Sequence, residues 1–200
     1  MHSLFSRNGR IFLLLAASFT LFAATPLQVA AEPGEEQLIV PGKSIGKIHL
    51  GPNGTAYLKD LPKPNASDPG MSQNRLIWTS GKAPEINILF IHTVSNAVID
   101  AKPSNEVTID EIRITSREFQ TREEIKCGST LAEIRKAFPE IQPAADSSGS
   151  IYQDAAHGIA FEFAEAAKDD SPCIAITVFT PNAARITTRE QIAGLLKDKP

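Results

Sequence analysis

Apolar and polar positions follow two different periods in the second half of the chain, and together they predict one helix and several strands. Across residues 131–138 the apolar positions recur at spacings of three and four, so they share one face of a helix. Thr130 and Glu133 have the spacing of a capping box, and Pro139 ends the helix. We therefore expect a short amphipathic helix, opened by a corner at Gly128.

Strand patterns surround this helix. Residues 159–163 alternate in polarity, so that Ile159, Phe161 and Phe163 are expected to face inward and Glu162 outward. Runs rich in β-branched and aromatic residues, bounded by turn residues, indicate the others. The strands expected in this half lie at 123–127, 150–154, 159–163 and 173–180.

The first half of the chain has the same order of patterns in a weaker form. A loop at 62–74, rich in Pro, Asn, Ser, Asp and Gly, separates a weak helix from the strands that follow. In the strand at 107–115 the inward face must switch partway, which a bulge near Asp110 would achieve. The segments expected are strands at 38–40, 47–50, 75–79, 86–94 and 107–115, and a helix at about 55–61.

A constant offset of 77 residues relates the two halves, and it also places Trp78 and Tyr152 on equivalent strands. One such unit is too small to be stable alone. The sequence therefore predicts an α+β fold of two tandem units, at 32–120 and 121–185, each with a short helix packed on a small antiparallel sheet. The matched positions are Ile48 with Ile125, Gly51 with Gly128, and Pro62 with Pro139.

Residues 186–200 are expected to form a C-terminal helix and tail. Ile192, Leu195 and Leu196 give an apolar stripe. We expect this helix to dock on the second unit, with a partner-binding helix as the alternative. Two capping boxes fit its start, Thr187 with Glu190 or Thr188 with Gln191.

Residues 1–31 have the pattern of a secretory signal. Arg7 and Arg10 precede an apolar run at 11–22, and small residues at 29–31 offer a cleavage point before Glu32. The alternative is an uncleaved anchor, but the run is shorter than the ~20 residues of a spanning helix. We expect an exported protein, periplasmic or extracellular, with no lipid anchor because no cysteine lies near the cleavage point.

Charge excludes two classes of partner. The chain has 20 Lys and Arg against 23 Asp and Glu, a formal net charge of −3. Loss of the signal with its two arginines would change this to −5. An acidic chain argues against a general binder of nucleic acid or of anionic membranes.

The second half resembles repeats in uncharacterised secreted bacterial proteins. At the level of fold it is similar to the helix-plus-antiparallel-sheet units of the β-lactamase-inhibitor protein and of the accessory lipoprotein of the outer-membrane assembly machine. The resemblance implies the fold alone and carries no binding residue across. It rests on Ile125, Gly128 to Ile134, Tyr152, Gly158 to Phe163 and Ile176 to Pro181.

Cys127 and Cys173 are the two cysteines of the chain. In an exported protein a disulfide between them is the first expectation. They would lie at the end of one strand and the start of another in the same unit. Two buried free thiols, or a redox or metal pair, are the alternatives.

The sequence predicts no catalytic, cofactor or metal site. His49, His92 and His157 are far apart and lack the spacing of metal ligands. The serines lack a nucleophile-elbow motif. Glu162 and Glu165 lie near one strand, where they would line a sheet face.

We expect a non-enzymatic binding or interaction module, with an unidentified envelope or extracellular protein as its partner. The sheet faces at Trp78 and Tyr152 are the candidate partner surface, although both aromatics also fit a core. A periplasmic small-molecule-binding protein is the alternative. A hydrolase whose site is assembled in the fold, around residues such as His92, His157 and Glu162, is the third reading.

Overall fold

The computed structural model describes residues 34–70, 72–82, 85–95, 98–99, 102–103, 106–145, 147–183 and 187–197. The expected signal at 1–31 lies outside these residues. The helices are η1 (Glu35–Gln37), α1 (Gly54–Leu58), α2 (Leu131–Ala137) and α3 (Arg189–Lys197). The strands are β1 (Ile39–Val40), β2 (Ser44–Ile45), β3 (Ile48–His49), β4 (Ala66–Pro69), β5 (Gln73–Lys82), β6 (Glu85–Ser95), β7 (Val98–Ile99), β8 (Lys102–Pro103), β9 (Val107–Ile114), β10 (Gln142–Pro143), β11 (Ile151–Asp154), β12 (Ile159–Phe163) and β13 (Cys173–Phe179).

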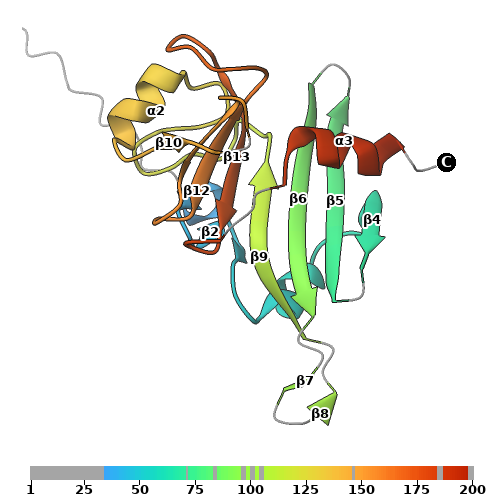
Figure 1. The fold of residues 1–200 in the computed structure, drawn as a ribbon. Helices are drawn as coiled ribbons and strands as arrows, with labels where there is room; N and C mark the ends of the chain where they lie inside the picture. Colours follow the sequence, from blue (N-terminus) through green and yellow to red (C-terminus); the bar gives the residue numbers. More distant parts are fainter. Residues whose placement is uncertain are drawn as a thin grey trace, which may run out of the picture. The chain divides into compact units, whose positions relative to one another are not determined.

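Eight strands form one antiparallel sheet in the order β10-β11-β12-β13-β9-β6-β5-β4 (Figure 1). A second sheet contains β1, β2 and β3, and β7 pairs with β8. The fold is thus mostly β with a few short helices, an α+β fold in the coarse sense. Neither of the two sheets contains a parallel pair among its named strands.

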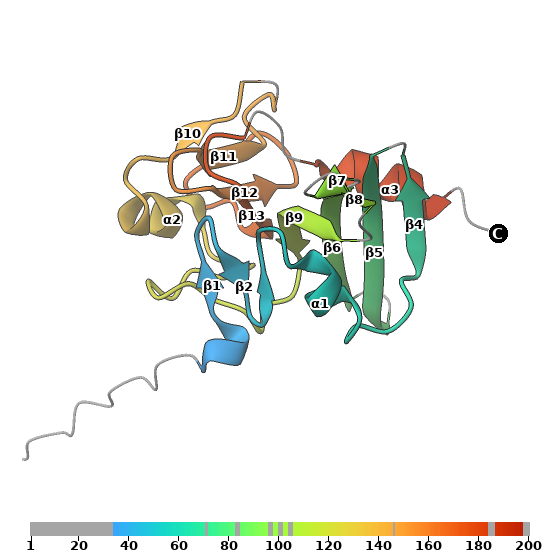
Figure 2. The same cartoon turned by 90° about the horizontal axis from the view of Figure 1, so that it is seen from below.

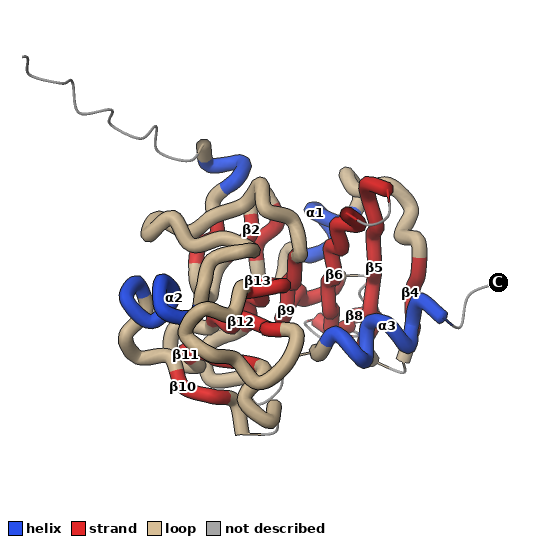
Figure 3. The backbone as a smooth tube through the Cα atoms, turned by 90° about the horizontal axis from the view of Figure 1, so that it is seen from above, coloured by secondary structure: helices blue, strands red, loops and turns tan. Residues whose placement is uncertain are grey.

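The two faces of the large sheet are covered differently. The small sheet, α1 and α2 lie on one face, and α3 lies on the other (Figures 2 and 3). The first face holds the main core, in which Leu131 and Ile134 of α2 pack with Phe161 of β12. The second face holds a smaller cluster, in which Ile192 of α3 packs on Ile77 and Phe90. We call these the core face and the α3 face.

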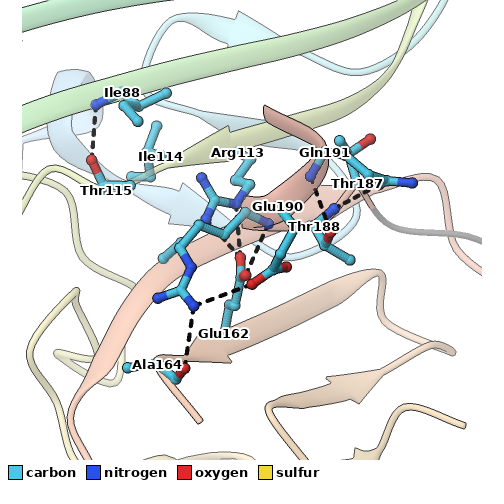
Figure 4. A network of polar contacts seen from close by, with 12 residues as sticks. Ile88, Arg113, Ile114, Thr115, Glu162, Ala164, Thr187, Thr188, Glu190 and Gln191 are labelled. Atoms are coloured by element: carbon cyan, nitrogen blue, oxygen red, sulfur yellow. Dashed lines mark hydrogen bonds and ion pairs between the residues drawn. The ribbon is translucent and has the colours of Figure 1, made fainter. Parts of the chain in front are cut away.

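The predicted helix starts are confirmed. The Thr130 side chain accepts a hydrogen bond from the Glu133 amide, and the Glu133 carboxylate accepts one from the Thr130 amide at 2.7 Å. Of the two boxes that the sequence allows before α3, the structure forms Thr188 with Gln191, the Thr188 amide donating at 2.9 Å (Figure 4).

The predicted bulge is confirmed at Asp110. His92 of β6 pairs with Glu111, whereas the next residue, Thr93, pairs with Ile109. Asp110 is therefore the extra residue in β9, and it reverses which alternate side chains face the core. As a result Ile109 and Ile112 both lie in the main core.

Two expected features differ in the structure. The strand expected at 123–127 is absent, because Glu124 has a φ of +64° and turns the chain, leaving one bridge between Gln120 and Lys126. The C-terminal helix docks on the first half of the sheet and not on the second. The α3 face there presents apolar Ile77 and Phe90, whereas the second half of that face is packed by Ala144 and Ala183.

In the part of the chain that the structure describes, no helix has the length and apolar character needed to cross a bilayer.

Candidate functional site

A cleft of about 540 Å³ opens on the core face beside Trp78. Its volume lies within the range of pockets that hold small ligands or side chains, roughly 300–1,000 Å³. Its base is made by β5, β6 and β9, and its walls by the small sheet and by the segments that follow α1 and β9. The apolar side chains lining it are Ile45, Ile48, Leu61, Pro62, Trp78, Ile88, Leu89, Ile114 and Phe119.

Strand pairing fixes the aromatic centre of the cleft. Trp78 of β5 stands opposite Leu89 of β6, and Leu89 stands opposite Ile114 of β9, so three side chains line one face across three strands. The Trp78 indole N–H donates a hydrogen bond of 2.7 Å to the Pro62 carbonyl. This bond fixes the indole ring and holds the loop after α1 at the cleft wall.

Polar side chains surround the opening. Lys63, Ser80, Asn87 and Glu118 line the cleft. The Asn65 side chain also lines it and accepts a hydrogen bond of 2.8 Å from the Thr79 amide, which ties the loop to β5. The cleft therefore combines an apolar interior with a polar rim, the composition expected of a binding site.

A second depression adjoins the cleft. It has a volume of about 650 Å³ and shares Asn87, Ser116 and Glu118 with the cleft lining. Its other lining residues include Ile86, Lys82 and Arg117. We call the cleft and this depression together the groove.

The two candidate aromatics have different surroundings. Both are largely buried, Trp78 at 9% and Tyr152 at 8% exposure. Trp78 lines the cleft, whereas Tyr152 does not. Arg135 of α2 lies 5.3 Å above the Tyr152 ring and donates a hydrogen bond of 3.4 Å to its hydroxyl. Tyr152 is thus covered by α2, and Trp78 is the aromatic that a ligand in the cleft would touch.

A polar cluster lies on the α3 face, in a cavity of about 370 Å³. His92 Nδ1 lies 2.6 Å from an Asp110 oxygen, and His92 Nε2 lies 3.0 Å from the Gln73 side-chain oxygen. Burial raises the pKa of Glu111 to about 7. Both Glu111 oxygens accept hydrogen bonds from Thr187, at 2.9 and 3.0 Å, so this carboxyl holds the chain before α3.

A buried ion pair lies on the same face (Figure 4). Arg113 donates to one oxygen of Glu162 from Nε at 3.1 Å and from Nη2 at 2.6 Å. The other Glu162 oxygen accepts from the Arg189 amide at 2.9 Å, at the first residue of α3. The exposed fractions of the two paired side chains are 1% and 7%. Glu162, expected to face outward, is therefore buried by α3 and its preceding segment.

The fold does not gather the residues named for a hydrolase. His92 belongs to the cluster at Asp110, and Glu162 to the ion pair with Arg113. His157 lies in a turn, with its Nδ1 2.7 Å from an Asp154 oxygen. Among the described residues, no three His, Cys, Asp or Glu side chains are grouped as metal ligands would be.

The predicted disulfide is wrong: Cys127 and Cys173 are free and buried. The Cys127 thiol donates to the Ile114 carbonyl at 3.7 Å, and the Cys173 thiol donates to the Ala175 carbonyl at 3.0 Å. Burial raises the pKa of Cys173. The structure therefore has the first of the two alternatives given above, a pair of buried free thiols, and both lie within the core.

Most residues of the cleft could not be predicted from the sequence. Trp78 and the loop at 62–74 could be named in advance, as an aromatic on a strand and a turn-rich segment. Ile45 and Phe119 could not, because they are ordinary apolar residues that reach the cleft only when the small sheet and the segment after β9 close its walls.

Comparisons with protein-family models and with curated protein sequences returned no match. Among solved structures, the chain is similar to one described as the crystal structure of the uncharacterized protein yfeY from Escherichia coli. The TM-score is 0.36 and the sequence identity 11%, and the match covers 72% of this chain and 97% of that one. A similarity this low carries no argument, and it does not confirm the fold-level resemblance to the two families named above.

Proposed function

We propose that the protein is a non-enzymatic binding module that holds an apolar side chain of a partner protein in the cleft at Trp78. The observation that carries this proposal is the cleft itself, with its buried aromatic base and polar rim. Buried aromatics in well-packed pockets are the usual energetic centres of protein interfaces.

The contacts of Trp78 support a preformed site. Its indole N–H is already hydrogen-bonded to the Pro62 carbonyl, and Leu89 stands opposite it on the neighbouring strand. A partner side chain would therefore meet a fixed surface, and little conformational entropy would be lost on binding.

A periplasmic small-molecule-binding protein is the second candidate. The volume of about 540 Å³ favours it, because a compact apolar molecule would fit without help from a larger partner. A hydrolase has less support, because His92, His157 and Glu162, the residues named for it above, lie in three separate hydrogen-bond networks.

Replacement of Ser80 by Arg tests the proposal. Ser80 is exposed and lines the cleft, so a long side chain there would fill it at little cost to the fold. The matched control is Ser67→Arg, another exposed serine on a strand of the same sheet, outside the cleft lining. We expect a partner captured from envelope and culture-supernatant extracts to bind the wild type and Ser67→Arg, and to bind Ser80→Arg at least tenfold more weakly.

Equal capture by Ser80→Arg would contradict the proposal. Trp78 is the one tryptophan of the chain, so its fluorescence reports directly on the cleft. A spectral shift on addition of a small apolar compound, without any captured protein, would favour the second candidate.

We also propose that the large sheet is built from two copies of one unit, at 32–120 and 121–185, with 186–200 added. The strand order supports this, because it is mirrored about the β9–β13 junction. At that junction Arg113 pairs with Thr177, and each is flanked by an isoleucine. The helices support it as well, since α1 begins at Gly54 and α2 at Leu131, which is the same offset of 77.

Local pairing gives further support for the two units. Gly51 and Gly128 both have positive φ, at +115° and +100°. Gly51 exchanges two backbone hydrogen bonds with Ile109, and the Gly128 amide donates to the Cys173 carbonyl. Each glycine thus lies beside the last long strand of its own unit.

We further propose that residues 1–31 direct export to the periplasm or beyond. The basic start and short apolar run support this. We expect the mature protein to begin at Glu32, which N-terminal sequencing of the protein from an envelope or supernatant fraction would check. A mature chain that retains Met1 would contradict the proposal.

A further inference from the structure

Strand β6 extends beyond its neighbour β9 at the groove. β6 runs from Glu85 to Ser95, but β9 pairs with it only from Leu89 onward. Residues 85–88 therefore have β5 on one side and no strand of the described chain on the other. Just past the end of β9, the Ile88 amide donates to the Thr115 hydroxyl at 2.8 Å, and the Thr115 amide donates to the Ile88 carbonyl at 3.1 Å.

These two bonds set the direction of the free backbone groups. The N–H and C=O of Ile88 point away from β5, toward the β9 side. Because strand residues two apart point the same way, the N–H and C=O of Ile86 also face the β9 side. On that side they have no hydrogen-bond partner among the described residues, and the Ile86 side chain is 50% exposed.

Unpaired backbone groups of this kind are recognised by an extended chain, which offers one N–H and one C=O in matching register. A compact small molecule would not satisfy both groups and fill the adjoining apolar cleft. The continuity of the groove, from Ile86 past Asn87 to Trp78, fits an extended occupant with one buried side chain.

The charges along the groove define the chemistry of that occupant. Among its described lining residues, Lys63, Lys82 and Arg117 are cationic and Glu118 is acidic. The chain as a whole has a formal charge of −3, so this local excess of cations runs against its composition. Complementarity favours an acidic partner segment.

We propose that the groove binds an extended, acidic peptide segment of a partner protein, which pairs with Ile86 of β6 and places one apolar side chain in the cleft at Trp78. This inference rests on the proposed function and specifies its partner. The segment would exchange two backbone hydrogen bonds with Ile86 and set carboxylates against Lys82 and Arg117.

The test uses a library of random octapeptides displayed on phage, panned against the mature protein. We expect the enriched peptides to carry at least two acidic residues and one large apolar residue. A synthetic copy of the strongest should bind, by fluorescence anisotropy, at least tenfold more weakly to Lys82→Glu/Arg117→Glu. N-methylation of the peptide amide that bonds to Ile86, found by methylating each amide in turn, should cost at least tenfold in affinity.

A second variant tests the strand edge from the side of the protein. Ile86→Pro removes the N–H that would donate to the peptide, and this N–H takes no part in the β5 ladder, so the sheet should be retained. We expect weakened peptide binding with unchanged circular dichroism. If Ile86→Pro does not fold, Lys82→Glu/Arg117→Glu and the N-methylated peptides still test whether the groove binds the peptide as proposed.

The outcomes separate this inference from the proposed function. Peptides without acidic bias, or binding that is insensitive to both N-methylation and charge reversal, would overturn the inference. If Ser80→Arg nevertheless abolished the binding of these peptides, the cleft would remain a binding site and the proposed function would stand. Failure to enrich any peptide would overturn the inference. If a protein partner were still captured by the wild type and not by Ser80→Arg, the proposed function would stand without the inference.

Discussion

Replacement of Arg113 by Met should lower the free energy of unfolding by about 3–5 kcal/mol, the largest effect that we expect of any single substitution. Arg113 is the largest fully buried side chain among the described residues, and its guanidinium makes two hydrogen bonds to Glu162. Without it, Glu162 would stay buried beneath the start of α3 with one hydrogen bond, from the Arg189 amide. Chemical denaturation of the two proteins at pH 7 measures the difference.

A double variant distinguishes the loss of a charge from the loss of packing. Arg113→Met with Glu162→Leu removes both charges, and replacement of a buried pair by apolar residues is often close to neutral. We therefore expect the double variant to recover most of the lost stability. The exposed pair Lys47–Glu36 is the control, and its removal should cost about 0–1 kcal/mol. An equal cost for both pairs would contradict the prediction.

Stability should fall as the pH rises from about 4.5 to about 7, because of Glu111. Burial raises the pKa of Glu111 from 4.5 to about 7 in the folded protein. In that window the unfolded chain releases the proton and the folded chain retains it, so rising pH favours unfolding. At 1.36 kcal/mol for each pKa unit, the loss is roughly 3 kcal/mol at most.

Glu111→Gln should remove this dependence. The free energy of unfolding, measured by denaturant titration between pH 4.5 and 8, should fall for the wild type and change less for the variant. Gln can still accept a hydrogen bond from the Thr187 amide, which preserves the attachment of the segment before α3. Glu140→Gln, at an exposed position, is the matched control and should leave the pH profile of the wild type unchanged. A wild-type profile that is flat across this window would contradict the prediction.

Local patterns explain which parts of the fold could be predicted. Helix α2 and strands β12 and β13 are marked by apolar periodicity, a capping box and bounding turns within a few residues of one another. Strands β4 and β10 lack such signals, because Ser67, Asp68 and Gln142 are polar and become strand only by pairing with β5 and β11. The position at which α3 docks depends on which part of the sheet is left uncovered by other elements. The sequence of α3 alone does not contain this information.

The candidate site could be predicted from the sequence only in part, for a similar reason. Trp78 could be named because it is the one tryptophan of the chain and lies in a strand pattern. The free edge at Ile86 could not be inferred, because it exists only where β6 outlasts β9 by a few residues. Glu162 was expected to face outward, but both Glu111 and Glu162 are buried, and each binds a residue far along the chain, Thr187 and Arg189 respectively.

The outermost strands of the large sheet each carry a proline, Pro69 in β4 and Pro143 in β10. A proline has no amide hydrogen to offer, and both strands are short, so neither end of the sheet is a good template for another strand. Copies of this chain at high concentration should therefore resist stacking edge to edge into fibrils. The strand addition proposed above would instead use the β9 side of Ile86, where β6 extends beyond the end of β9.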